Sequence, residues 1–85
     1  MSYHVYILYS KELDNYYVGH TGDSLESRLR KHLSNHHGFT ARAIDWIVVY
    51  KELLSYKVDA FQRGHFIKSQ KSRKFIENLI SVAVW

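Results

Sequence analysis

The sequence contains no cysteine and no proline, and only four glycines and one methionine. The absence of cysteine excludes a disulfide scaffold and any metal site built from thiolates. No apolar run approaches the roughly 18–20 residues that a membrane-spanning helix needs. Residues 1–4 lack the basic and apolar character with which a signal peptide begins. We therefore expect a cytoplasmic protein without a membrane partner.

The chain also lacks low-complexity runs, internal repeats and any stretch typical of a linker. With 85 residues, the expected organisation is one domain over residues 1–85. A domain of this size buries a modest core, but seven Tyr, four Phe and two Trp each bury a large apolar area. The net charge of +4 is compatible with a phosphate-rich partner, although charge alone is weak evidence.

The first half of the chain predicts a β-hairpin followed by a helix. Residues 4–10 are almost continuously apolar, which indicates a strand buried on both faces. A five-residue, mainly polar connection over residues 11–15 separates it from a second strand over residues 16–21, a spacing typical of an antiparallel hairpin. Asp23 or Ser24 can cap a helix over residues 25–33, in which Leu25, Leu29 and Leu33 share one apolar face.

The second half predicts a strand and two helices. A loop over residues 34–40 leads to residues 46–50, whose β-branched and aromatic side chains indicate a buried strand. Residues 58–68 have apolar side chains at positions 60, 61, 66 and 67, a helical stripe. Ser72 can cap a last helix. The predicted fold is therefore α+β, a three-stranded antiparallel sheet flanked by helices in the order β-β-α-β-α-α. The last helix is expected to turn four side chains inward: Phe75, Ile76, Leu79 and Ile80.

Two tyrosines in the hairpin are the most informative feature. Tyr6 lies in the first strand, within Val-Tyr-Ile, and Tyr17 in the second, within Tyr-Val-Gly. Tyrosines on adjacent strands can place their phenols side by side, and Gly19 leaves space for a backbone or a phosphate to approach. On the hairpin alone, two ordinary core tyrosines are the favoured explanation.

Further motifs follow in a fixed order. Arg28 and His32, in Arg-Leu-x-x-His, lie four residues apart and share a helix face. Together with the hairpin, the ordered set resembles the GIY-YIG nuclease superfamily, in particular its small single-domain members, with Val5 in place of the first glycine. The resemblance covers nearly the whole chain. The remaining motifs are Gly38-Phe39-Thr40-Ala41-Arg42, Trp46 to Tyr50, Ala60-x-x-Arg63, Ile67-Lys68 and Lys71-Ser72-Arg73-Lys74.

The resemblance implies hydrolysis of nucleic acid phosphodiesters with Mg²⁺ or Mn²⁺, as in intron homing endonucleases and the N-terminal nuclease domain of the DNA-repair excinuclease. It implies that Tyr6 and Tyr17 are the motif tyrosines, one of which helps to activate water. Arg28 would neutralise phosphate oxygens in the transition state. His32 would relay a proton, and His20 stands where some members carry a lysine.

The resemblance fails at the metal ligand. In the family, a glutamate before Ile-Lys on the second long helix is the protein ligand of the metal, and here that position is Gly64. Asp59 and His65 are turned about 140° and 100° away around the helix, and imidazole suits Mg²⁺ poorly. We therefore expect no metal ligand and impaired catalysis. Asn78 is a weak candidate for a family asparagine whose aligned position is Ile76.

A nucleic-acid-binding module without catalysis is the main alternative. Clustered basic side chains can follow a phosphate backbone, of DNA most readily, or of RNA. Two further alternatives are a zinc site at His32, His36 and His37, and a homodimer formed through residues 80–85. The candidate nucleic-acid-binding residues are Gly19, Arg28, Arg30, Lys31, Arg42, Lys68, Lys71, Arg73 and Lys74.

Overall fold

The computed structural model describes residues 2–34 and 42–82. Three strands form one sheet in the order β2-β1-β3, and both pairings are antiparallel. Strand β1 spans Tyr3–Ser10, β2 spans Asn15–Thr21 and β3 spans Ile47–Leu54. The α+β fold with a three-stranded antiparallel sheet, expected from the sequence, is confirmed.

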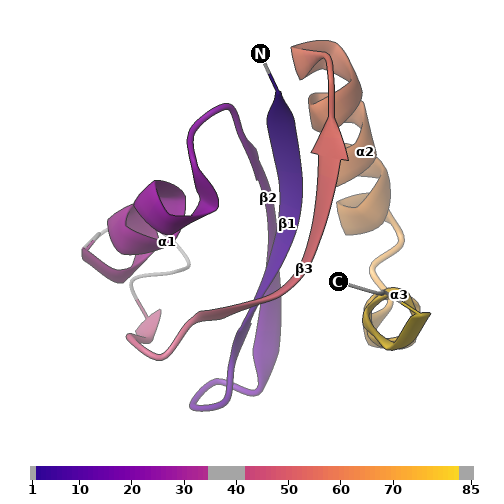
Figure 1. Cartoon of the computed structure of the whole chain (residues 1–85). Helices are drawn as coiled ribbons and strands as arrows, with labels where there is room; N and C mark the ends of the chain where they lie inside the picture. Colours follow the sequence, from indigo (N-terminus) through magenta and orange to yellow (C-terminus); the bar gives the residue numbers. More distant parts are fainter. Residues whose placement is uncertain (1, 35–41, 83–85) are drawn as a thin grey trace.

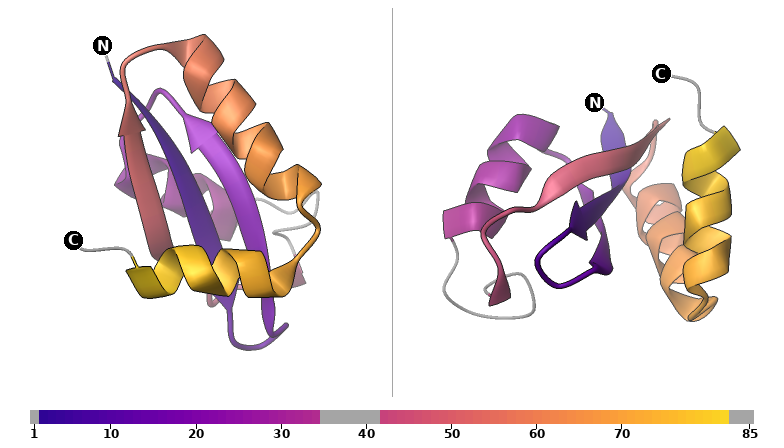
Figure 2. Two further views of the ribbon diagram at one scale, coloured as in Figure 1. Left: turned by 90° about the vertical axis from the view of Figure 1, so that its right-hand side faces the viewer. Right: turned by 90° about the horizontal axis from the view of Figure 1, so that it is seen from below.

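Helices cover both faces of this sheet. Helix α1 (Leu25–Ser34) lies on one face, and α2 (Lys57–Ser69) and α3 (Arg73–Val82) lie on the other, as Figures 1 and 2 show. The serines predicted as caps are in place at both shorter helices. The Ser24 hydroxyl accepts the Ser27 N–H at 3.2 Å, and the Ser72 hydroxyl accepts the Phe75 N–H at the same distance.

The central strand contributes four consecutive residues to the core. Val5, Tyr6, Ile7 and Leu8 are at most 1% exposed, as expected for a strand buried on both faces. Its alternate side chains divide the core into two layers, because successive residues of a strand point to opposite faces. Tyr6 and Leu8 pack toward α1, whereas Val5 and Ile7 pack toward α2 and α3.

Several sequence expectations were wrong in detail. The third strand does not begin at Trp46 but runs from Ile47 to Leu54, and it is an edge strand. It is not buried, since Ile47 is 56% exposed and Tyr50 alone among its residues is buried. Its β-branched composition indicated the strand correctly but could not show that one of its edges has no neighbour. Ser34 belongs to α1 rather than to the predicted loop, and residues 35–40 lie outside the described part of the chain.

The helical stripes also differ from the prediction. The buried residues of α2 are Ala60, Gly64 and Ile67, while the predicted Phe61 and Phe66 are exposed. A glycine is invisible to a search for apolar side chains, so the stripe was placed on the wrong side of the helix. On α1, Leu33 lies at the rim, with 37% of its surface exposed.

The segment that leads into β3 is tied to the hairpin. The Asp45 carboxylate accepts the Ser10 hydroxyl at 2.6 Å and the Glu12 backbone N–H at 2.9 Å. Ser10 is fully buried, so this contact connects the end of β1 to the start of the third strand across the bottom of the sheet.

Candidate functional site

Tyr6 and Tyr17 lie on the same face of the sheet. Tyr6 pairs with Gly19 in the β1–β2 ladder, and Tyr17 pairs with Leu8, two residues further along β1. Both tyrosines therefore turn toward α1. Tyr6 is only 1% exposed, whereas Tyr17 is partly accessible.

Helix α1 supplies two partners for the Tyr6 phenol. Arg28 donates its Nε–H to Tyr6 Oη at 3.2 Å, and His32 Nε2 lies 2.8 Å from the same oxygen. Since the phenol oxygen accepts from Arg28, its own hydrogen is placed to be donated to a neutral His32. The spacing of four residues on one helix makes this double contact possible.

The protonation of this cluster follows from its burial. Burial raises the pKa of Tyr6, opposed in part by the neighbouring Arg28 guanidinium. Burial also lowers the pKa of His32, and the positive charge of Arg28 lowers it further. At neutral pH the cluster therefore holds a protonated phenol, a neutral imidazole and one positive charge on Arg28.

Tyr17 connects this cluster to the other side of the sheet. Its ring packs edge-on against His32, with 5.0 Å between the ring centroids. The Lys68 ammonium, from the end of α2, lies 5.5 Å from the centroid of the Tyr17 ring, a cation–π distance. Side chains from α1, β1, β2 and α2 thus meet around the edge formed by β2.

Gly19 lies directly against the Tyr6 phenol. A Cβ atom at position 19 would lie 2.5 Å from Tyr6 Oη and 2.6 Å from the adjacent ring carbon. The space left by the missing side chain is therefore taken up by the Tyr6 phenol. In this conformation the glycine allows the tyrosine to lie flat across β2.

Position 64 faces the sheet from the buried side of α2. The nearest side chain to a Cβ built there is His20, whose Nδ1 would be 3.8 Å away. Burial lowers the pKa of His20, as do the positive charges of Lys68, Arg28 and Lys57. A neutral imidazole among cations is a poor seat for a hard divalent cation. Over residues 2–34 and 42–82, no group of three acidic, histidine or cysteine side chains is placed to hold a metal.

The residues present therefore do not fit the Mg²⁺ or Mn²⁺ that the family resemblance implies. Asp59 lies on the exposed first turn of α2, and His65 is exposed and stacks on Phe61. The zinc alternative at positions 32, 36 and 37 cannot be placed, since His36 and His37 are outside the described residues. Asn78 is exposed on α3, while Ile76 packs against the core.

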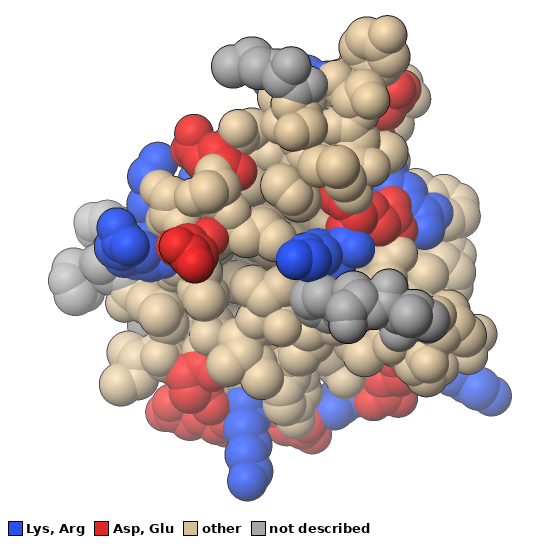
Figure 3. Space-filling view, viewed as in Figure 1, with Lys and Arg blue, Asp and Glu red and all other residues tan. Residues whose placement is uncertain are grey.

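The other basic candidates are spread over the molecule. Lys31 pairs with Asp23 at 3.3 Å, and Arg73 pairs with Asp14 and Glu77. The face seen in Figure 3, on the β3 side, carries Lys and Arg mixed with Asp and Glu and shows no continuous basic surface. Lys68 and Lys71 instead line a hollow beside β2. Arg30, Arg42 and Lys74 are exposed.

Sequence reasoning missed one polar cluster next to position 64. Arg63 donates from Nε and Nη2 to both oxygens of the Glu52 carboxylate, at 2.9–3.1 Å. The Tyr50 hydroxyl donates to the same carboxylate. The cluster fastens α2 to β3 one residue before Gly64. Its sequence signal is weak, because acidic and basic residues eleven positions apart pair only through the tertiary fold.

The fold is an α+β domain with a three-stranded antiparallel sheet. At one edge of this sheet the Tyr6 phenol, the Arg28 guanidinium and the His32 imidazole lie together, as expected for a nuclease-like domain. The model of the GIY-YIG catalytic domain family matches residues 2–78, and the chain belongs to this family. No curated protein and no solved structure matches the chain. None of the helices within the described residues has the length and apolar character to cross a membrane.

Proposed function

We propose that this protein binds nucleic acid at the edge formed by β2 and hydrolyses phosphodiesters poorly or not at all. Family membership supports nucleic acid as the ligand and hydrolysis as the ancestral reaction. The observation that supports poor or absent hydrolysis is Gly64. This residue is buried on the inner side of α2 and offers no side-chain atom to bind a metal. As part of the same proposal, the ligand is DNA rather than RNA, the protein is located in the cytoplasm, and its role is in DNA repair.

Arg28 is the proposed phosphate ligand. Its Nε–H is held by Tyr6, which fixes the plane of the guanidinium before any ligand arrives. The guanidinium carries further N–H donors in the same plane, and such a fork matches the oxygens of a phosphate. Its pKa is raised by the hydrogen bond to Tyr6, so the positive charge persists throughout the physiological range.

Tyr6 is proposed to position this cluster rather than to act on water. Its phenol is almost fully buried, and its pKa is raised above the ordinary value. A general base needs a pKa near the working pH and contact with the proton that it removes. Tyr17 is more accessible and adjoins both His32 and Lys68. We therefore assign Tyr17 to ligand contact and Tyr6 to holding Arg28 and His32.

The divalent metal would supply stabilisation of the leaving oxygen and of the developing charge in the ancestral reaction. The present chain keeps the groups that hold a phosphate but lacks the carboxylate that holds the metal. Positioning by Arg28 alone supplies part of the transition-state stabilisation, so cleavage is expected to be very slow or absent.

Nicking of supercoiled plasmid tests the proposal. The natural chain, Gly64→Ala and Gly64→Glu are compared with Mg²⁺ and with chelator. We expect no divalent-dependent nicking by the first two and measurable nicking by Gly64→Glu. The alanine variant controls for the stabilising effect of removing a helical glycine. If the natural chain nicks and Arg28→Ala abolishes the nicking, another group holds the metal and the interpretation of position 64 is wrong.

Failure of Gly64→Glu on every DNA form would have a different meaning. The catalytic defect would then extend beyond one ligand, and binding without catalysis would become the whole function. Divalent-dependent thermal stabilisation of Gly64→Glu, absent from Gly64→Ala, reports the metal site independently of activity.

A further inference from the structure

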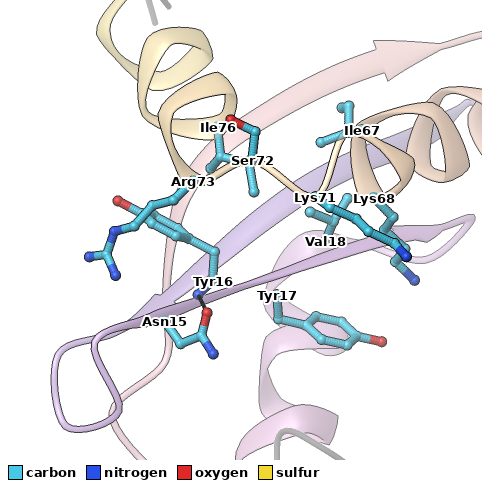
Figure 4. Close-up of a pocket in the computed structure, with 10 residues that line it drawn as sticks. All are labelled: Asn15, Tyr16, Tyr17, Val18, Ile67, Lys68, Lys71, Ser72, Arg73 and Ile76. Carbon is cyan, nitrogen blue, oxygen red and sulfur yellow. Dashed lines mark hydrogen bonds between the residues drawn. The ribbon is translucent and has the colours of Figure 1, made fainter.

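A hollow of about 420 Å³ lies beside β2, where α2 ends and α3 begins (Figure 4). Its volume falls within the range of small-molecule and cofactor sites, about 300–1,000 Å³. Ten residues line it, from β2, α2, α3 and the connection between the two helices, and none of these ten is acidic. They are Asn15, Tyr16, Tyr17, Val18, Ile67, Lys68, Lys71, Ser72, Arg73 and Ile76.

The lining combines an apolar base with a basic end. Val18 and Ile67 are 5% and 1% exposed, so the base of the hollow is the hydrophobic core itself. Figure 4 shows the Lys68 and Lys71 side chains extending toward the end where the Tyr17 ring lies. The Arg73 guanidinium reaches the other way, toward Asp14 in the hairpin turn. Lys68 and Lys71 therefore lie with the Tyr17 ring at one end. At the other end the Arg73 guanidinium, paired with Asp14 and Glu77, lies 5.4 Å from the centroid of the Tyr16 ring.

Tyr17 is common to the hollow and to the proposed phosphate site. On its α1 side the ring contacts His32, and on its α2 side it lies under the Lys68 ammonium. Tyr17 therefore adjoins both the cluster that contains Arg28 and the basic end of the hollow. Strand β2 is also an edge of the sheet, so one side of its backbone faces the hollow without a neighbouring strand.

Lys71 has an unusual backbone. Its φ of 48° is in the left-handed region, at the position just after a helix where glycine is the common choice. A lysine in that conformation is less favourable than glycine, yet its side chain is placed at the basic end of the hollow. Position 71 thus carries a cation although glycine would give a more stable backbone there.

We propose that this hollow receives the base of one unpaired nucleotide, with Lys68 and Lys71 contacting its phosphate. The inference rests on the proposed function and names its substrate class: nucleic acid with an unpaired nucleotide, rather than intact duplex. An aromatic ring beside an apolar floor provides a stacking surface, and lysines at the rim match the adjoining phosphate. In an intact duplex the bases are stacked inside and cannot enter the hollow without being extruded.

Binding of the full chain to matched fluorescent DNA probes tests this assignment. The probes are a single strand, a blunt duplex, and the same single strand with abasic sites in place of its bases. All single-strand probes carry the same phosphates, so a difference between them reports the bases. We expect the single strand to bind more tightly than the duplex, and the abasic strand to bind at least about fivefold more weakly than the normal strand.

Lys71→Gly provides the matched test in the protein. It should weaken binding of the single strand while leaving the melting temperature equal or higher, because glycine suits the left-handed backbone. Lys11→Ala, in the exposed hairpin turn, removes the same charge away from the hollow and should bind as the natural chain does. If Lys71→Gly proves unstable, Lys71→Ala tests the contribution of the charge instead. The abasic probe tests the contribution of the bases without any change to the protein.

The outcomes separate the two proposals. Equal affinity for normal and abasic strands, with Lys71→Gly indistinguishable from Lys11→Ala, would overturn the base site and leave phosphate binding intact. No salt-dependent affinity for any probe would overturn the proposed function itself. If nucleic acid does not bind and sedimentation shows a dimer that Lys71→Gly dissociates, the hollow is instead an interface between two copies of the chain.

Discussion

The Tyr6 phenol fills the space that a side chain at Gly19 would need, since a Cβ on residue 19 would lie 2.5 Å from the phenol oxygen. The two face each other in the β1–β2 ladder, and the tyrosine ring crosses the strand where the glycine has no side chain. The first and second halves of the family motif are therefore sterically coupled. A side chain at position 19 would therefore press on the phenol that is hydrogen-bonded to Arg28 and His32.

Gly19→Ala should therefore destabilise the protein and disturb the site together. The Tyr6 ring is buried and cannot yield freely, so the cost of overpacking should be about 1–3 kcal/mol in the free energy of unfolding. Gly22→Ala is the matched control. Its Cβ would lie 2.9 Å from Tyr3, whose partly exposed ring has room to shift. Urea denaturation compares the two, and equal small effects would contradict the proposed coupling.

Position 64 should respond differently to the same substitution. A Cβ there meets nothing closer than 3.8 Å, so Gly64→Ala should stabilise the protein by up to about 1 kcal/mol through helix propensity. Gly64→Glu should gain less without metal, because its carboxylate lies on the buried side of α2. Denaturant unfolding in chelator measures both. A loss of stability in the alanine variant would show that the helix packs more closely on β2 than the structure indicates.

The Glu52–Arg63 pair should contribute measurably to stability. Both side chains are partly buried, and removing Arg63 takes three hydrogen bonds from a carboxylate that keeps its bond from Tyr50. Arg63→Met should lower the free energy of unfolding by about 1–3 kcal/mol. Lys31→Ala, which breaks the exposed pair with Asp23, should change it little. Similar effects of the two variants would mean that the fastening of α2 to β3 is weak.

Stability should fall as the pH drops below the ordinary pKa of histidine. Burial lowers the pKa values of His32 and His20 in the folded protein, so the unfolded chain binds these protons more readily. Their contribution is complete above about pH 6.5 and is lost progressively below it. Melting temperatures between pH 7.5 and 5.5 measure the effect. His32→Gln and His20→Asn should each reduce the dependence, and an unchanged profile in both would contradict it.

Arg28 should carry part of the salt dependence of nucleic-acid binding. Log affinity is expected to fall with log salt concentration by about 0.9 for each phosphate neutralised on duplex DNA. Arg28→Ala should lower the affinity and reduce the slope by about 1. Arg28→Lys should restore the slope but not the full affinity, because an ammonium lacks the planar fork. Lys11→Ala serves as the distant control, and an equal effect of Lys11→Ala would argue for diffuse attraction.

Much of the fold could be predicted because the signals were local. The apolar run around Ile7, the caps Ser24 and Ser72 and the four-residue spacing of Arg28 and His32 each follow from neighbours in the sequence. The order of motifs was sufficient to indicate the family. It also predicts that Gly64 stands at the position of the family's metal ligand, which the plasmid-nicking comparison tests.

The parts that could not be predicted depend on long-range packing. The contact of Gly19 with the Tyr6 ring depends on the register between β1 and β2, and sequence composition does not reveal that register. Glu52 and Arg63 pair because β3 extends to Leu54, beyond its expected end. The buried stripe of α2 passes through a glycine, so a search for apolar side chains selected Phe61 and Phe66 instead.

The strand order β2-β1-β3 has a consequence for how the chain reaches its native state. The β1–β2 hairpin joins neighbouring residues and can form quickly, but β1 pairs with β3 only after α1 and the following segment have been looped out. Until then the most apolar strand has one open edge, and open apolar edges promote aggregation. Refolding yield should therefore depend on protein concentration more steeply than the small size of the chain suggests. The contact of Asp45 with Ser10, which draws the start of β3 to the end of β1, would shorten that exposed interval.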